Sequence, residues 1–158
     1  MTKRDRTCCF TGHRDIPESD LPRIIDNTTA IIENLIGCGY KYFGVGGAIG
    51  FDTLAADILF RLRKRYPHIK VILVYPFDGY TSRWTTQQIN KHKEQLSKFD
   101  KVVCVCNTPS KGAYLERNRH LINFSSYCVC YSTRNYGGTA YTVDYAISQG
   151  VKIYNVAK

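Results

Sequence analysis

The chain has 158 residues, of which 44% are hydrophobic and 22% are charged, and its formal net charge is +9. This length fits one domain of ordinary size with a two-sided core, and the composition excludes an intrinsically disordered chain. The positive charge favours an anionic partner, but the basic residues are spread along the chain and form no dense basic tail. A local basic site or a basic face is therefore favoured over an arm that wraps around nucleic acid.

Apolar runs that alternate with glycine, proline and polar breaks predict six strands and five helices along the chain. In chain order these are a strand at 7–11, a helix at 21–36, a strand at 40–45, a helix at 51–65, a strand at 70–75, a helix in the later part of 78–98, a strand at 101–106, a helix at 113–124, a strand at 127–131, a helix at 142–149 and a strand at 151–156.

The strands are continuous apolar runs without a polar face, which is typical of a parallel sheet that is covered on both sides. We therefore expect an α/β fold: a Rossmann-like, doubly wound, mainly parallel sheet with helices on both faces. No internal repeat, linker or low-complexity segment divides the sequence. The expected organisation is a single domain over residues 1–158.

Seven cysteines are present, and four of them form the pairs Cys104-x-Cys106 and Cys128-x-Cys130 within apolar runs. Zinc sites place such pairs on turns with wider spacing, whereas a free cysteine is among the most buried residue types. We interpret these cysteines as small core residues and expect no metal, no disulfide and no cofactor.

The apolar run that follows the charged N-terminus, Cys8 to Phe10, is too short for a signal peptide, and no segment approaches the length of a membrane span. We expect a cytoplasmic protein with no membrane partner. The aromatic content is compatible with a homodimer.

The glycine-rich stretch between the strand at 40–45 and the helix at 51–65 has the arrangement that often holds a phosphate. Glycine permits a positive φ and a close backbone approach, and the first amides of a helix point toward an anion. The spacing matches neither the dinucleotide-binding fingerprint nor a P-loop, so a tight packing turn is the alternative. Asp52 lies near the start of this helix, and we expect it to cap the helix rather than act as a base.

In open α/β sheets, ligands bind beyond the carboxyl ends of the strands, and four loops rich in glycine, hydroxyl and cationic residues follow such ends. The strand at 101–106 is followed by Thr108, Ser110 and Lys111. The other three loops hold the residues that we expect to contact a ligand: Thr11, Gly12, His13, Arg14, Gly46, Gly47, Gly50, Gly137, Gly138 and Thr139.

These residue types suit a phosphorylated ligand. The Gly46-Gly47 and Gly137-Gly138 backbones would approach phosphate or ribose closely, and the hydroxyls of Thr11 and Thr139 would donate hydrogen bonds. Arg14 offers a planar, permanently charged fork for phosphate. His13 is ambiguous, because it could stack on a base, touch phosphate or serve a structural role.

The segments Cys8-Cys9-Phe10-Thr11-Gly12-His13-Arg14, Gly46-Gly47-Ala48-x-Gly50-Phe51-Asp52, Arg117-Asn118-Arg119 and Gly137-Gly138-Thr139-x-x-Thr142-Val143 resemble the YpsA-type branch of the SLOG superfamily. This superfamily groups Rossmann-like domains related to DNA-processing protein A and to the "lonely guy" phosphoribohydrolases. The resemblance spans the whole chain in order, and it implies a domain that binds nucleotides or nucleotide-derived ligands.

The enzymatic branch of that superfamily carries P-G-G-x-G-T-x-x-E, whereas this chain has Ala140 and Tyr141 at the third glycine and the following threonine. The acid would be Asp144, which is one methylene shorter, and Arg117-Asn118 replaces an R-K pair. Cleavage of an N-glycosidic bond needs a carboxylate within reach of the ribose or the water. Asp144 and Arg117 are therefore candidate catalytic residues only if the chain resembles this branch.

Three functions remain. The favoured one is a sensor or regulatory module that binds a nucleotide or nucleotide-derived ligand of the ADP-ribose or NAD-related class at the carboxyl edge of the sheet. The first alternative is an N-glycosidase acting on nucleoside monophosphates. The second is a single-stranded nucleic-acid binder, which the DNA-processing branch suggests and which we favour less.

Overall fold

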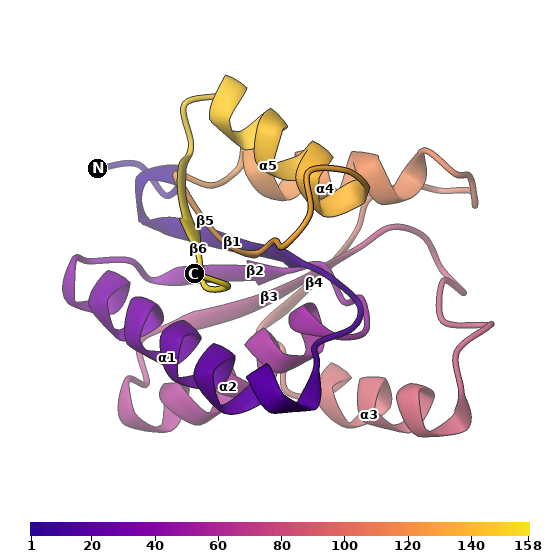
Figure 1. Cartoon of the computed structure of the whole chain (residues 1–158), viewed down its shortest axis with the longest axis horizontal. Coiled ribbons are helices and arrows are strands. Elements are labelled where there is room, and N and C mark those ends of the chain that lie inside the picture. Colours follow the sequence, from indigo (N-terminus) through magenta and orange to yellow (C-terminus); the bar gives the residue numbers. More distant parts are fainter.

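The computed structural model describes residues 1–158 as a six-stranded parallel sheet with helices on both faces (Figure 1). It confirms the Rossmann-like α/β fold expected from the sequence. The strands pair in the order β4-β3-β2-β1-β5-β6, and every pair is parallel. The elements are β1 (Thr7–Gly12), α1 (Leu21–Gly37), β2 (Tyr42–Val45), α2 (Phe51–Arg65), β3 (Lys70–Tyr75), α3 (Thr86–Leu96), β4 (Lys101–Cys104), α4 (Ala113–Asn123), β5 (Tyr127–Tyr131), α5 (Gly138–Ser148) and β6 (Lys152–Asn155), with short 3-10 turns at Arg4–Arg6 and Glu18–Asp20.

The helices form two layers, with α1, α2 and α3 on one face of the sheet and α4 and α5 on the other (Figure 1). The larger core of 21 buried residues lies between the sheet and α1 and α2, and the rings of Phe10, Phe43 and Phe51 pack together there. A second cluster of seven buried residues, which includes Ile122, lies under α4 and α5. Each fully buried large side chain contributes about 1.5–3 kcal/mol, so both layers stabilise the sheet.

Local signals in the sequence explain where two of the helices end or begin. The chain leaves α1 at Cys38 and Gly39, and Gly39 has a φ of 97°, a conformation that glycine adopts without strain. Helix α3 begins with a capping box, in which the Thr85 hydroxyl accepts from the amide of Gln88 and the Gln88 side chain accepts from the amide of Thr85.

Two predicted boundaries are wrong in ways that matter for function. Helix α5 begins at Gly138, four residues before the predicted start, because Gly137 turns the chain with a φ of 90° and lets the helix start at once. Gly138 and Thr139 therefore belong to the first turn of a helix and not to a loop. Strand β4 ends at Cys104 rather than at residue 106, because its partner β3 ends at Tyr75, opposite Cys104, and Pro76 follows there.

The prediction that the paired cysteines are core residues is right for one pair and wrong for the other. Cys128 and Cys130 are buried in β5, next to the centre of the sheet. Cys104 is exposed and Cys106 is half-buried, because β4 is an edge strand of the sheet. The periodicity of an apolar run does not reveal whether the strand is central or at an edge.

The order of the strands places a crevice between β1 and β5. From β1 the chain builds β2, β3 and β4 on one side, and α4 then carries it back to β5 on the other side of β1. The loops that leave β1 and β5 therefore diverge at the carboxyl edge of the sheet, which is where open α/β sheets bind ligands. None of the helices combines the length and the apolar composition needed to cross a membrane.

Candidate functional site

A cavity of about 670 Å³ lies at this point of reversal, beyond the carboxyl ends of β1 and β5. Seven of the ten predicted contact residues line it: Thr11, Gly12, His13, Arg14, Gly137, Gly138 and Thr139. The rest of the wall comes from the loop after β2, from the first turn of α2, from α4 and from the loop after β5. These other lining residues are Ala48, Asp52, Tyr114, Arg117, Asn118, Arg134 and Tyr136.

The glycines after β2 do not line the cavity but let the chain pack closely beside it. A Cβ at Gly50 would lie 2.3 Å from the backbone oxygen of Arg14, and Gly50 has a φ of 84°. A Cβ at Gly47 would lie 2.6 Å from the hydroxyl of Tyr80, which donates to the Gly47 oxygen at 3.3 Å. These two glycines bring the loop against its neighbours, as the packing-turn alternative expects.

Gly46 has a different neighbourhood, because the two buried charged side chains of the site meet above it. A Cβ at this position would lie 2.9 Å from Oδ2 of Asp52 and 3.0 Å from Cζ of Arg117. Arg117 comes from α4, on the opposite side of the sheet, and donates hydrogen bonds to the Gly46 oxygen and to the side-chain oxygen of Asn118. Gly46 thus makes room for charged groups at the floor of the cavity.

The N-terminus of α5 opens toward the cavity without a side-chain cap. Gly137 occupies the cap position, and no side chain accepts a hydrogen bond from the first-turn amides. A Cβ at Gly137 or Gly138 would meet nothing within 4 Å. Amides at such a terminus, together with the helix dipole, form a site for an anion.

Two arginines lie at the mouth of the cavity. Arg14 follows β1 and Arg134 follows β5, and both are exposed. The Arg134 guanidinium also lies 5.7 Å from the centre of the Tyr136 ring. Together with the α5 terminus, these cations make the mouth electropositive, which favours a phosphorylated ligand.

His13 has a structural role in the wall of the cavity. The amide of Thr133 donates to Nε2 of His13 at 2.9 Å, and Nη2 of Arg134 lies 2.9 Å from Nδ1. Because a neutral imidazole accepts at one nitrogen only and both neighbours are donors, just one of these contacts is a hydrogen bond. Burial, and then the charge of Arg134, lower the pKa of His13. The ring is therefore held neutral and ties β1 to the loop after β5.

Asp52 does not cap α2, contrary to expectation. Gly50 is at the cap position, and Oδ2 of Asp52 instead accepts from the amide of Ala48 at 3.2 Å, outside the helix. The side chain is 6% exposed, and its other oxygen, Oδ1, has no hydrogen-bond partner. Burial raises the pKa of Asp52 to about 6, although the charge of Arg117 lowers it.

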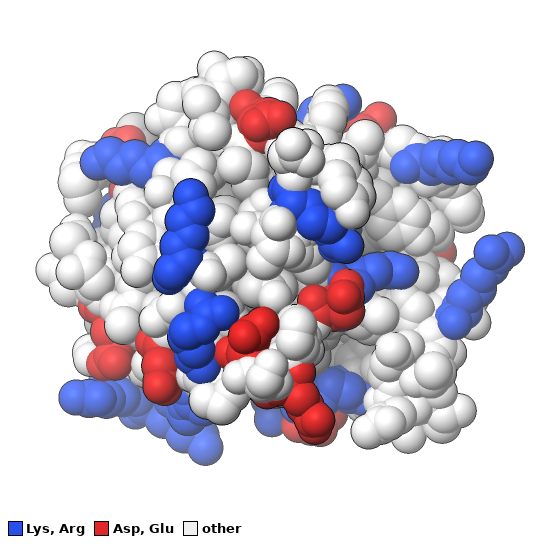
Figure 2. Space-filling model, in the orientation of Figure 1, with Lys and Arg blue, Asp and Glu red and all other residues white.

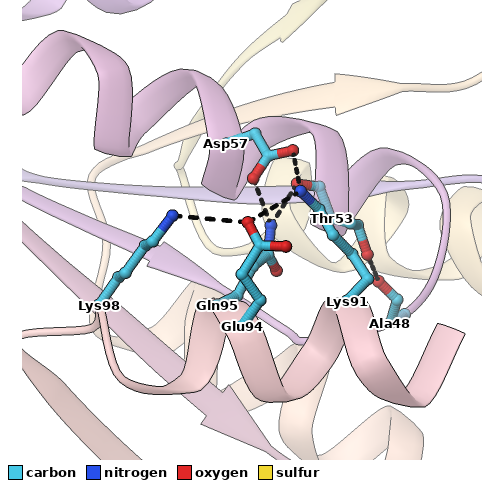
Figure 3. A network of polar contacts seen from close by, with 7 residues as sticks. All are labelled: Ala48, Thr53, Asp57, Lys91, Glu94, Gln95 and Lys98. Atoms are coloured by element: carbon cyan, nitrogen blue, oxygen red, sulfur yellow. Dashed lines mark hydrogen bonds and ion pairs between the residues drawn. The ribbon is translucent and has the colours of Figure 1, made fainter. Parts of the chain in front are cut away.

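A network between α2 and α3 supports the first turn of α2, which carries Asp52 (Figure 3). The Thr53 hydroxyl donates to the Ala48 oxygen at 3.0 Å, and the buried amide of Gln95 donates to the Thr53 oxygen at 3.0 Å and to Oδ1 of Asp57 at 2.8 Å. Lys91 pairs with Oδ2 of Asp57 at 2.8 Å. Helix α3 thereby holds the first turn of α2 and the loop in front of it.

Some candidates from the sequence lie outside the cavity. Thr108, Ser110 and Lys111 follow the edge strand β4 and are exposed. Asp144 lies on α5, is exposed and does not line the cavity, so it is not placed to act on a ligand bound there. Arg117 does line the cavity, next to Asp52.

The profile of the YpsA family, described as the YspA SLOG family, matches residues 17–156 of this chain. The chain belongs to this family. Among its relatives, an uncharacterized SPbeta prophage-derived protein of Bacillus subtilis, YoqJ, is 29% identical over 137 residues, which cover 78% of this chain and 80% of that protein. A UPF0398 protein of Staphylococcus epidermidis is 25% identical over 116 residues, which cover 69% of this chain and 62% of that protein.

Two solved structures share the fold of this YpsA-family chain. DNA processing protein A from Streptococcus pneumoniae superposes with a TM-score of 0.69 at 15% identity, over 97% of this chain and 50% of that one. DNA processing protein A from Helicobacter pylori, described in a single-stranded DNA binding mode, superposes with a TM-score of 0.65 at 19% identity. The superposition covers 93% of this chain and 63% of that one. The chain thus spans between half and two thirds of these proteins, and the likeness concerns the fold.

Proposed function

We propose that this chain binds a nucleotide or nucleotide-derived ligand of the ADP-ribose or NAD-related class, as a sensor or regulatory module. The observation that carries the proposal is the cavity at the point of reversal, where the uncapped N-terminus of α5 meets Arg14 and Arg134. Amides and guanidinium groups that converge on one opening are complementary to phosphate. The volume of about 670 Å³ lies within the usual range of roughly 300–1,000 Å³ for small-molecule sites.

The rest of the cavity suits the other parts of a nucleotide. The Tyr136 ring is 67% exposed beside the opening, and Tyr114 lines the wall, so an aromatic face is available to a base. The buried Thr11 and Asp52 and the half-buried Asn118 also line the cavity, and their polar groups offer hydrogen bonds to a sugar. The basic side chains in Figure 2 are separated by acidic and uncharged surface on the face shown, which favours a local site over a continuous charged track.

Ligand-dependent stabilisation tests this proposal. We expect ADP-ribose, NAD or AMP to raise the melting temperature and to give calorimetric binding heat, whereas adenosine, which lacks phosphate, gives much less. Gly138→Asp places a carboxylate at the α5 terminus in open space, where it suits the helix dipole but repels phosphate. This variant should fold and lose binding, and Gly138→Asn is its uncharged control. If no phosphorylated nucleotide gives a shift or heat, the proposal fails.

A second candidate, single-stranded nucleic-acid binding, is supported by two pairs of arginine and tyrosine in which both tyrosines are exposed. The guanidinium of Arg134 lies 5.7 Å from the Tyr136 ring centre, and that of Arg119 lies 5.4 Å from the Tyr141 ring centre. Exposed aromatic rings beside arginines stack on bases. Fluorescence anisotropy with labelled oligo(dT) should then show an affinity that falls steeply with salt and weakens when Tyr136 and Tyr141 are both replaced by alanine. A flat signal at low salt removes this candidate.

A further inference from the structure

A second cavity, of about 380 Å³, lies on the face of the sheet that α4 and α5 cover (Figure 1). On this face α5 packs on β1, β5 and β6, and α4 packs on β1 and β3. The second cavity lies between the later part of α4 and the end of the sheet that β3 and β4 form. It shares no lining residue with the cavity at the point of reversal, which is lined by the earlier part of the same helix. The two cavities are therefore separate sites.

The interior of the second cavity is apolar. Ile72 and Val74 of β3, Val103 of β4 and Leu121 of α4 line it, together with Phe124 at the end of α4. The first four side chains are buried or half-buried, and only Phe124 is mainly exposed, at 61%. The apolar surface is thus recessed below the surface of the molecule. A slim aliphatic chain can enter such a recess, whereas the flat surface of another protein cannot.

The neutral hydroxyl groups in the wall are used by the protein itself. The hydroxyl of Thr7 donates to the backbone oxygen of Lys3 at 2.7 Å, and that of Ser125 donates to the backbone oxygen of Leu121 at 2.7 Å. No carboxylate lines the cavity. Apart from the ring of His120, the polar side-chain groups that remain to recognise a ligand are therefore cations.

Three exposed cations, Lys3, Arg4 and Lys101, lie at the opening of the second cavity, and none of them forms a salt bridge. Two are held in place. Nε of Arg4 donates to the backbone oxygen of Asn123 at 3.2 Å, and Nζ of Lys3 lies 4.7 Å from the centre of the Tyr42 ring. Cations gathered without an acid repel one another, and an anion among them is attracted by all three.

We infer that the second cavity binds a small amphipathic carboxylate, whose aliphatic chain fills the apolar interior while its carboxylate lies among Lys3, Arg4 and Lys101. The chain is stabilised because apolar surface leaves water, and the carboxylate accepts charge-assisted hydrogen bonds. The volume of about 380 Å³ is near the lower end of the roughly 300–1,000 Å³ that small-molecule sites span, which suits a medium-length chain such as octanoate. This inference is independent of nucleotide binding at the other cavity.

Calorimetry with octanoate, below its critical micelle concentration, and with matched probes tests the inference. 1-Octanol has the chain without the charge, octylamine carries the opposite charge, and acetate has the carboxylate without the chain. Octanoate should bind about tenfold or more tightly than each of them. Its affinity should also exceed that of heptanoate by about three- to fourfold, the effect of one buried methylene. Equal binding of octanoate and either 1-octanol, octylamine or acetate overturns the inference.

Two substitutions in β4 test the location of the site. Val103→Phe places a larger apolar side chain in the second cavity and should abolish octanoate binding. Val102→Phe is the matched control, because successive side chains of a strand point to opposite faces and Val102 does not line the cavity. Circular dichroism and urea unfolding check that both variants fold. If Val103→Phe binds octanoate as the wild type does, or if both variants lose it equally, the inference is wrong.

Charge reversal at the opening tests the carboxylate without filling the interior. Lys101→Glu should weaken octanoate binding by about tenfold and change 1-octanol binding little. Lys152→Glu is the matched control, since Lys152 is also the exposed first residue of an edge strand, β6, at the opposite side of the sheet. This control should keep the wild-type affinity. An equal loss in the two variants would show that octanoate responds to net charge alone and would contradict the inference.

Three further outcomes would assign the binding elsewhere, and each overturns the inference. If Gly138→Asp abolishes octanoate binding, octanoate lies in the cavity at the point of reversal. If octanoate does not bind and sedimentation shows a dimer that Val103→Phe dissociates, this face is an interface between copies of the chain. If octanoate does not bind, but an acidic peptide or oligo(dT) binds the wild type and not Val103→Phe, the partner is a macromolecule.

Discussion

Arg117 of α4 donates a hydrogen bond to the backbone oxygen of Gly46, which directly follows β2. This bond crosses the carboxyl edge of the sheet and joins the helix layer of α4 and α5 to the glycine loop that precedes α2. The two layers thereby meet at the floor of the cavity. The charged floor and the anion-binding mouth are consequently parts of one connected site, and its stability can be tested residue by residue.

Gly46→Ala should destabilise the protein by about 1–3 kcal/mol, since the new methyl overlaps Asp52 and Arg117, which cannot move without leaving buried polar groups unpaired. Urea unfolding measures the change. Gly37→Ala is the control, because a Cβ at this helical position meets nothing within 4 Å, and alanine there should be neutral or slightly stabilising. Equal effects of the two substitutions would contradict the close packing at Gly46.

The raised pKa of Asp52 predicts the direction in which this group changes stability with pH. The folded-state pKa of about 6 lies above the ordinary value of 3.8, so the folded protein binds this proton more tightly than the unfolded chain. Protonation of Asp52 therefore adds to the free energy of unfolding. This contribution is fully present below pH 3.8 and is lost as the pH rises through about 6. A difference of about 2 pH units corresponds to about 3 kcal/mol.

Asp52→Asn should remove this contribution. The difference in unfolding free energy between variant and wild type should therefore move by about 2.5 kcal/mol in favour of the variant between pH 4 and pH 7. Urea unfolding at several pH values measures it. Parallel curves for the two proteins would show that Asp52 is ionised normally in the folded state.

The network between α2 and α3 contains one buried and several exposed partners, and they should differ in strength (Figure 3). Gln95→Leu keeps the volume but removes two hydrogen bonds made by a buried side chain, so it should cost about 1–3 kcal/mol. Lys98→Ala removes a pair with Glu94 in which both side chains are about half exposed, and it should cost less than about 1 kcal/mol. If thermal or urea unfolding showed that Lys98→Ala destabilises the protein more than Gln95→Leu, the stronger role of the buried Gln95 would be contradicted.

The fold was predictable because its signals are local. Continuous apolar runs, glycine stops and basic helix ends marked nearly every element, and the helix at 51–65 matches α2 residue for residue. The start of α5 could not be predicted, because glycine at 137 and 138 is as compatible with a loop as with a helix that begins directly after it. Nor could the exposure of Cys104, because it depends on β4 being at the edge.

The candidate site was predictable only in part, for a physical reason. Glycine is required wherever the backbone approaches something closely, and the sequence does not say whether that neighbour is a ligand or the protein itself. The close neighbour of Gly47 is the side chain of Tyr80, and that of Gly50 is the backbone of Arg14, so in both cases it is the protein itself. The unpartnered oxygen of Asp52 depends on which groups the fold brings around it, and no spacing in the sequence reports that.

His13 predicts a pH effect opposite in sign to that of Asp52 and local to one wall of the cavity. Its lowered pKa means that the unfolded chain binds the proton more tightly, so the stabilisation is present above the ordinary value of 6.5 and is lost as the pH falls through the folded-state value. Protonation turns Nε2 into a donor that faces the Thr133 amide, and the loop after β5 is released from β1.

Hydrogen exchange should therefore show faster exchange of the amides in residues 133–139 below pH 6, after correction for the intrinsic pH dependence. His13→Gln offers a side-chain acceptor that does not titrate, and it should abolish this change. His68→Gln is the control, since His68 is exposed and lies between α2 and β3, at the other end of the molecule. Exchange in 133–139 that follows the intrinsic rate at every pH, or that changes equally in the two variants, would contradict a role for His13 in holding the cavity wall.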